Sequence, residues 1–355
     1  MESIETVERT GSIKREASGS WWQRNGPVVS LLLLAPVVSE VLSGTARVSV
    51  IFIVIPQIMT WGCGALLIRY WTRRWRKGWG SMLLMGLALG MAEEFVIQQT
   101  SISPMVGLAQ HAYGRAFGVN WAYLLWALGF ESVWVVMIPV HLVELLFRAR
   151  RDETWLRTRG MTIASLVFIL GSVMAWYGWT QRARVAVFHM APYSPPPGYI
   201  AAGLAMILLL AYCAYLLPAS RTSGNVRVSH STPSPWIEGV LTCVLGTGWM
   251  ASVVISWGSG VLPNLPFGWP LAVGLAWAAL TLILPIRWTS GFGWSDAHRY
   301  ALVFGGVMGG MLGGFFVFKI GGALTVDWIG KAVLNVAATI WLIAIGRRLK
   351  IGAHR

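Results

Sequence analysis

Five glutamates lie inside stretches of the sequence that are otherwise apolar: Glu40, Glu93, Glu94, Glu131 and Glu144. The chain has only 14 acidic residues, so about a third of them fall in such stretches. A carboxylate in hydrocarbon costs about 2.5–3.5 kcal/mol even on a lenient insertion scale. Carboxyl groups held there serve as general acids and bases, or as carriers of protons and cations. These residues therefore define the candidate functional site.

The stretches around them are long enough to cross a membrane. The 355 residues are 55% hydrophobic and 12% charged, with a mean hydropathy of +0.61, which excludes an ordinary soluble enzyme and a disordered chain. Because a spanning helix needs about 20 apolar residues, we predict an all-α, polytopic integral membrane bundle of about ten transmembrane helices. The ten predicted spans are Pro27–Leu42, Val48–Tyr70, Gly80–Gln99, Val119–Phe147, Met161–Trp179, Gly198–Pro218, Trp236–Trp257, Trp269–Arg287, Arg299–Lys319 and Trp328–Arg347.

The basic residues predict the orientation of these spans. A net charge of +14 is also typical of nucleic-acid-binding proteins. With the N-terminus in the cytoplasm, however, 22 of the 28 Lys and Arg residues fall at the inner ends of the spans, which is the positive-inside pattern. We therefore expect both termini to be cytoplasmic, the bacterial cytoplasmic membrane to be the location, anionic inner-leaflet lipids to be partners and nucleic acid not to be one.

The polar stretches divide the chain only weakly. Residues 1–26 form a predicted cytoplasmic tail, residues 27–347 a single transmembrane domain and residues 348–355 a second tail. A Ser-, Thr- and Gly-rich segment, Ala219–Pro235, separates two possible sub-bundles at 27–218 and 236–347.

The positions of the glutamates within their spans predict that four of them meet. Glu40 and Glu93 each lie 13 residues into outward-running helices, or about 20 Å from the inner face at about 1.5 Å per residue. Glu131 lies 12 residues into an inward-running helix, about 18 Å from the outer face. Glu40, Glu93, Glu94 and Glu131 are therefore expected to line one cavity between the midplane and the outer leaflet. Glu144 lies near the inner end, where an ion pair with Arg148 is expected.

The third predicted span adds a pattern of small residues. Gly86, Gly90, Glu94 and Gln98 recur every four residues and share one helix face. A neighbouring helix can approach the glycines closely and enclose Glu94, while Glu93 points roughly 100° away. Two adjacent carboxyl groups in a low dielectric do not both ionise easily, so we expect one of them to be protonated near neutral pH.

The stretch from Gly90 to Gln98, with Glu93 and Glu94 at its centre, resembles the Glu-Glu-x-x-x-Arg helix of CAAX-prenyl-endopeptidase-type (CPBP) intramembrane proteases. That resemblance implies that the glutamates, with histidines from later helices, activate water for peptide hydrolysis. Gln98 stands where that motif has Arg, and His141 lies too near the inner face to match the later histidine. The wider stretch is also similar to bacterial multispan membrane proteins, a resemblance that names no activity.

Three functions follow as hypotheses. The first is a membrane-embedded hydrolase acting on a membrane peptide or lipid-linked substrate, with no cofactor or metal. Its catalytic candidates are Glu93, Glu94, Glu131 and His111, and its binding candidates are Glu40, Gln98 and Arg115. The second is a proton- or cation-coupled transporter with the same glutamates as the coupling site. The third is a non-catalytic scaffold or lipid-interacting protein, in which the glutamates join helices or pair with Arg47, Arg69 or Arg115.

Two further patterns predict packing alone. Gly305-Gly306, Gly309-Gly310 and Gly313-Gly314 form two interleaved ladders of small residues, which favour close helix contact. Asp327 and Lys331 are spaced as an i,i+4 pair that supports the last helix.

Overall fold

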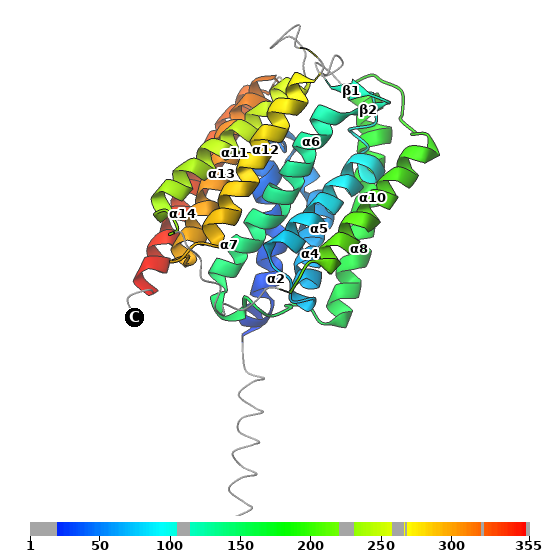
Figure 1. The fold of residues 1–355 in the computed structure, drawn as a ribbon. Helices are drawn as coiled ribbons and strands as arrows, with labels where there is room; N and C mark the ends of the chain where they lie inside the picture. The colour runs from blue at the N-terminus through cyan, green and yellow to red at the C-terminus, as the bar shows by residue number, and fades with distance from the viewer. Residues whose placement is uncertain are drawn as a thin grey trace, which may run out of the picture.

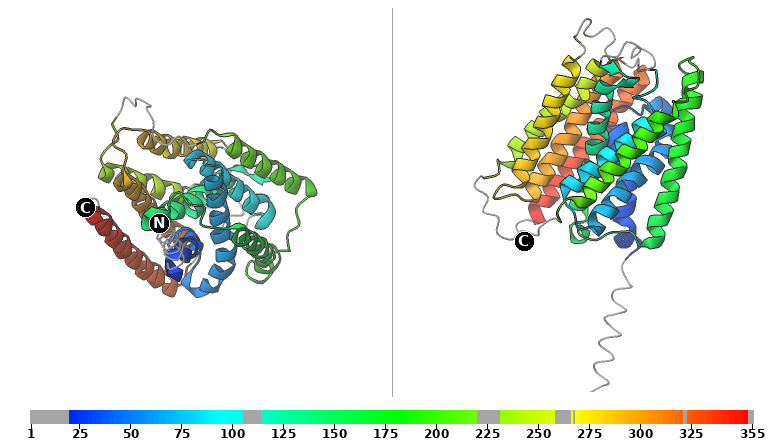
Figure 2. Two further views of the ribbon diagram at one scale, coloured as in Figure 1. Left: turned by 90° about the horizontal axis from the view of Figure 1, so that it is seen from below. Right: turned by 45° about the vertical axis from the view of Figure 1, so that its right-hand side comes forward.

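The chain folds into a bundle of long helices packed side by side (Figures 1 and 2). The computed structural model describes residues 20–104, 114–219, 231–257, 266, 268–320 and 323–352. Within these ranges, nine helices are long and apolar enough to cross a membrane. The first described helix begins, and the last ends, at the same end of the bundle (Figure 1).

Ten long helices follow one another along the described chain, and several of them contain a π-helical turn. Their parts are α2 (Trp21–Pro36) with η1 (Val37–Val41); η2 (Val48–Ile53), α3 (Val54–Gln57), η3 (Ile58–Gly62) and α4 (Cys63–Arg74); α5 (Trp79–Ala92) with η4 (Glu93–Ile97); α6 (Trp121–Phe130), η6 (Glu131–Met137) and α7 (Ile138–Leu146); α8 (Thr158–Trp176), η8 (Tyr177–Ala183) and α9 (Arg184–Ala186); α10 (Pro197–Leu216); α11 (Pro235–Trp257); α12 (Trp269–Thr289); α13 (Asp296–Ile320); and α14 (Thr325–Gly352). A short 3₁₀ turn, η7 (Arg148–Arg150), follows α7, and β1 (Arg115–Ala116) pairs antiparallel with β2 (Val119–Asn120) before α6.

The predicted all-α class is confirmed, and nine of the ten predicted spans correspond to helices that are long and apolar enough to cross a membrane. The first predicted span, Pro27–Leu42, forms the helix of α2 and η1, but this helix is not among the nine that satisfy both length and hydropathy. It carries Arg24 and Asn25 in its first turns and Glu40 near its end. These polar residues make it less apolar than the other long helices.

The π-helical turns are accompanied by proline in the first helices. Pro36 has no N–H to donate to the Leu32 carbonyl four residues earlier. A Cβ on Gly62, in η3, would lie 2.4 Å from the Leu32 oxygen. Glycine at this position therefore lets the second long helix approach the backbone of the first where its hydrogen-bond ladder is interrupted.

The glycine ladders of α13 pack against two different neighbours, which confirms their predicted packing role. A Cβ on Gly305 would lie 2.2 Å from the Gly239 oxygen of α11, and one on Gly309 would lie 2.7 Å from the Cys243 oxygen. The second ladder faces η6, because the Trp134 indole donates to the Gly306 oxygen at 3.0 Å. The ladders thus bring α11 and η6 against α13 at backbone distance.

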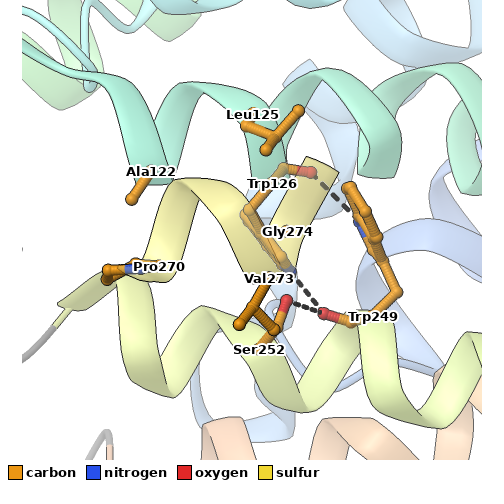
Figure 3. Close-up of a pocket in the computed structure, with 8 residues that line it drawn as sticks. All are labelled: Ala122, Leu125, Trp126, Trp249, Ser252, Pro270, Val273 and Gly274. Atoms are coloured by element: carbon orange, nitrogen blue, oxygen red, sulfur yellow. Dashed lines mark hydrogen bonds between the residues drawn. The ribbon is translucent and has the colours of Figure 1, made fainter. Parts of the chain in front are cut away.

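Two tryptophans join α6 to α11 by reciprocal hydrogen bonds. The Trp126 indole donates to the Trp249 oxygen at 3.1 Å, and the Trp249 indole donates to the Trp126 oxygen at 3.2 Å. Figure 3 shows this pair beside a small pocket where α12 covers both helices. One cluster of buried apolar side chains extends from Leu31 of α2 to Ile345 of α14, so helices before and after residue 230 share a core.

Candidate functional site

Four buried glutamates from three long helices meet in the bundle. Glu40 lies in η1, Glu93 and Glu94 begin η4, and Glu131 begins η6. Their exposed fractions are 8%, 8%, 2% and 3% in that order. Glu93 is close enough to Glu131, Glu94 and Glu40 to interact electrostatically with each. The structure therefore brings together the four residues that the depth estimate placed at one level.

Glu93 interacts more strongly with Glu131 than with the other carboxyl groups of this glutamate cluster. Glu131 Oε2 is buried and has no hydrogen-bond partner. Two carboxyl groups can form a hydrogen bond with each other only when one of them carries a proton, because a carboxylate is an acceptor only. A proton shared by this pair would therefore connect two helices.

Glu40 is held by neutral donors. The Thr45 hydroxyl donates to Glu40 Oε2 at 2.6 Å, and the Gln57 amide donates to the same oxygen at 3.3 Å. Thr45 lies in the loop after η1, and Gln57 ends α3. These donors orient the carboxyl group without adding charge to the cluster.

Glu94 is bound by the segment that follows its own helix. The Ser101 backbone N–H and hydroxyl donate to Glu94 Oε2 at 2.8 and 2.6 Å. Tyr193 and Arg115 hold this segment in place, since both donate to the Ile102 oxygen, at 3.0 and 3.1 Å. Burial raises the pKa of the Tyr193 phenol, which keeps it a proton donor.

The glycine face of α5 packs closely against a neighbouring helix, as predicted. The glutamate that it approaches is Glu131, whereas the sequence predicted Glu94. A Cβ on Gly86 would lie 2.8 Å from Ser132 Cα, and one on Gly90 would lie 3.3 Å from Glu131 Cβ. These glycines therefore bring η6 against α5. Beyond Ala92 the helix is π-helical, so the four-residue period does not continue to Glu94. Glu93 faces Glu131, whereas Glu94 binds Ser101.

The basic residues weighed as partners of the cluster have other contacts. Arg69 pairs with Glu144 at 3.0 Å. Arg115 donates to the Ser103, Ile102 and Gly118 oxygens, so it braces the loop that carries Ser101. Arg47 adds positive charge near Asp327.

Glu144 and Arg148, which are predicted to pair with each other, have other partners in the structure. Glu144 pairs with Arg69 and Arg73, whereas Arg148 pairs with Asp296 at 3.3 Å. The expected Glu144–Arg148 pair is therefore wrong, because the chain leaves the helical path after Leu146.

The expected contact between Asp327 and Lys331 is also replaced. The Lys331 ammonium donates to the Leu42 and Ser43 oxygens at 2.8 and 3.0 Å. Asp327 accepts from the Ser49 and Leu324 backbone N–H groups. Lys331 thereby supplies hydrogen bonds to backbone carbonyls just after the helix that carries Glu40.

Among the remaining candidates, His111 lies outside the described residues. His141 is buried in α7, after η6, and contacts Glu144 rather than the glutamate cluster. Gln98 is half-buried, and its backbone N–H donates to the Glu93 oxygen.

Sequence reasoning missed three neighbours of the cluster: Thr45, Gln57 and Ser101. Gln57 carried a usable signal, because it is a polar residue inside the second predicted span. Tyr123, which lies close enough to interact with all four glutamates, resembles the many other aromatic residues of the chain and carried no such signal.

The chemistry available to the cluster is proton exchange. Its members are carboxyl groups, and their neighbours are hydroxyl and amide groups. In the part of the chain that the structure describes, no group of three or more His, Cys, Asp or Glu side chains is arranged to hold a metal ion. No protein-family model, curated protein or solved structure matches the chain.

Proposed function

We propose that this multispan helical protein is a proton-coupled transporter in which Glu40, Glu93, Glu94 and Glu131 bind and release the coupling proton. The observation that carries the proposal is the burial of these four carboxyl groups close enough to interact electrostatically, with Glu93 interacting most strongly with Glu131. Ionisable residues inside membrane helices commonly form proton relays. A proton that moves between two carboxyl groups on different helices links protonation to how those helices pack.

The local helix geometry supports this proposal. Glu40, Glu93, Glu94 and Glu131 all lie in π-helical turns, and such turns frequently occur at functional sites. Secondary transporters place their coupling sites where membrane helices are interrupted near the midplane. A change of the protonation state here can therefore shift helices that are already irregular.

Infrared spectroscopy of the protein in lipid bilayers tests proton binding directly. The C=O stretching band of a protonated carboxyl group is expected to change in amplitude as the bulk pH is varied. Glu93→Gln and Glu131→Gln should each remove part of this change. The control is Glu153→Gln, because Glu153 is a half-exposed side chain at the far end of the bundle and should leave the buried band unchanged.

Coupling requires a second measurement in proteoliposomes with an imposed pH gradient. Uptake or efflux of at least one solute from a broad panel should depend on the gradient and be lost in Glu131→Gln. A pH-independent carboxyl band, or an absence of gradient-driven movement in the panel, contradicts the proposal.

A glutamate-dependent hydrolase is the second candidate, and the same observation favours it. Two carboxyl groups that share a proton can activate water, since one accepts a proton while the other donates one. Glu94→Gln should then abolish cleavage of a membrane-peptide library by the purified protein. Unchanged cleavage in both Glu93→Gln and Glu94→Gln would exclude it. A scaffold predicts instead that Glu94→Gln lowers thermal stability and leaves biological activity intact.

A further inference from the structure

A second feature of the bundle lies apart from the glutamate cluster: a cavity of about 300 Å³ among α5, α6–η6–α7, α11, α12 and α13. Its walls are mostly apolar, with Leu83, Leu128, Leu245 and Leu282 from four of these elements. The wall hydroxyls of Ser132 and Thr281 donate to carbonyl oxygens of their own helices. The cavity therefore suits a hydrocarbon chain.

The cavity is long as well as apolar. Along α6–η6–α7 its lining runs from Leu125 to His141, which is roughly 24 Å at about 1.5 Å per residue. The hydrocarbon core of a bilayer is about 30 Å thick. One extended chain fits this length.

The Thr242 hydroxyl also lines the cavity and has no hydrogen-bond partner. The ionisable side chains of the lining, His141 and Arg299, lie at one end of this length. Both ring nitrogens of His141 are buried without a partner, as are Nε and Nη1 of Arg299. The nearest carboxylate oxygen to both side chains is Glu144 Oε2, at 3.8 Å from His141 Nδ1 and from Arg299 Nη1. That distance is too long for a hydrogen bond. The Trp79 ring lies on the imidazole, with ring centroids 4.1 Å apart.

Positive charge is in excess at this end of the cavity. Glu144 Oε1 already accepts from Arg69 at 3.0 Å and from Arg73 at 2.6 Å. Asp296 is shared by Arg148 and Arg151. Asp152 also interacts with Arg69. Three carboxylates therefore face five arginines once Arg299 is included, so a further anion is electrostatically favourable here.

We infer that the cavity binds a single-chain amphiphile with an anionic head, the chain lying along the apolar walls and the head pairing with Arg299 beside His141. An anionic oxygen would supply the missing acceptor for Arg299 Nε and Nη1 and would offset the excess charge. The head would lie at the end where α5 and α13 begin and α7 and α12 end, which is the predicted cytoplasmic side. This inference does not rest on the function of the glutamate cluster.

Equilibrium binding of hexadecyl phosphate to the purified full-length protein in detergent tests the inference. Hexadecanol has the same chain without the charge and serves as the ligand control. Because charge-assisted hydrogen bonds are the strong ones, hexadecyl phosphate should bind about tenfold to a hundredfold more tightly than hexadecanol. In Arg299→Gln this preference should fall to about onefold, with hexadecanol binding unchanged. Arg347→Gln alters an exposed arginine at the same end of the bundle and should keep the preference.

The location of the chain is tested by a matched pair of substitutions on α12. Ala278 lines the cavity, whereas Ala276 is exposed and does not. Ala278→Trp should weaken binding of both probes at least tenfold by filling the cavity, and Ala276→Trp should not. Thermal unfolding of each variant identifies any that fails to fold. Arg347→Gln and Ala276→Trp, which alter exposed residues, are the reference variants for the change in binding.

Three results would overturn the inference. One is equal affinity of the wild-type protein for hexadecyl phosphate and hexadecanol. Another is equal weakening by Ala276→Trp and Ala278→Trp. The third is competition by diacyl phosphatidylglycerol in mixed micelles at the same concentration as hexadecyl phosphate, because this would identify a general phospholipid site rather than a single-chain one.

Discussion

At the scale of single residues, neutral donors orient two carboxyl groups of the glutamate cluster, those of Glu40 and Glu94. Thr45 and Gln57 serve Glu40, and Ser101 serves Glu94. Neutral donors fix the geometry of a carboxyl group without placing a full positive charge beside it, and an arginine partner would favour the ionised form by its charge as well. The partners are therefore as informative about the site as the glutamates.

Replacing Ser101 tests this dependence. In Ser101→Ala the hydroxyl bond of 2.6 Å to Glu94 is lost while the backbone N–H bond remains. We expect the free energy of unfolding to fall by about 1–2 kcal/mol, since a buried polar group loses one of its partners. Thermal unfolding in detergent, with circular dichroism as the readout, measures the loss.

The control for this substitution is Ser165→Ala. The Ser165 hydroxyl contacts only the Met161 sulfur of its own helix, at 3.6 Å. Its removal should change stability by less than about 0.5 kcal/mol. Similar losses in both variants would mean that the Ser101 hydroxyl does not stabilise the Glu94 carboxyl.

At the scale of helices, the π-helical turns decide which side chains meet. Glu131 begins η6, and Glu144 lies 13 residues later in α7. The first interacts with Glu93 of η4, and the second forms an ion pair with Arg69 of α4. A π-helical turn carries one residue more than an α-helical turn, so η6 sets the rotation between the two contacts.

Deleting one residue from η6 should therefore cost one of the two contacts. Deletion of Val133, a half-buried residue, rotates the two halves of the helix by about 100° relative to each other. We expect a loss of about 3–5 kcal/mol, which is typical of a broken buried pair. Deletion of Gly178 from η8 is the matched control because that glycine is exposed near the end of its helix. Equal effects of the two deletions would exclude a special role for η6.

The glycine ladder of α13 gives a second prediction at this scale. A Cβ added at Gly305 would lie 2.2 Å from a backbone oxygen of α11, so the helices must separate. Gly305→Ala should lower the free energy of unfolding by about 1–3 kcal/mol through overpacking. Gly178→Ala introduces a Cβ with no atom within 4 Å. If Gly305→Ala is as stable as Gly178→Ala, the close contact with α11 does not exist in the membrane.

The sequence predicted the elements better than it predicted their contacts. Long apolar runs, the depth of Glu40, Glu93 and Glu131, and the α13 glycines depend on composition and on 1.5 Å of rise per residue, so they could be predicted without tertiary information. Side-chain partners depend on helix rotation. The helix of Glu144 ends at Leu146, so the expected partner of Glu144 was wrong. Glu94 binds Ser101, in a segment beyond its own helix whose position depends on tertiary contacts.

At the scale of the whole molecule, charge is distributed along the bundle axis. Basic residues gather where α4 ends and α5 begins, and in the segment that joins α7 to α8, and both places lie at one end of the bundle. The segment after α9, near Tyr193, lies at the opposite end and is poor in basic residues. The positive-inside rule then predicts that Arg157 faces the cytoplasm and Ser194 the outside.

Cysteine labelling tests this orientation directly. In a variant whose three native cysteines, Cys63, Cys213 and Cys243, are replaced by alanine, a single cysteine is introduced as Arg157→Cys or Ser194→Cys, both at exposed positions. A membrane-impermeant maleimide applied to intact bacterial spheroplasts should label Ser194→Cys at once and Arg157→Cys only after permeabilisation. The opposite labelling pattern would mean that the bundle has the reverse orientation, with Arg299 on the outer side. The anionic head in the cavity would then have to come from the outer leaflet, and the proton pathway to the glutamates would open from the cytoplasm.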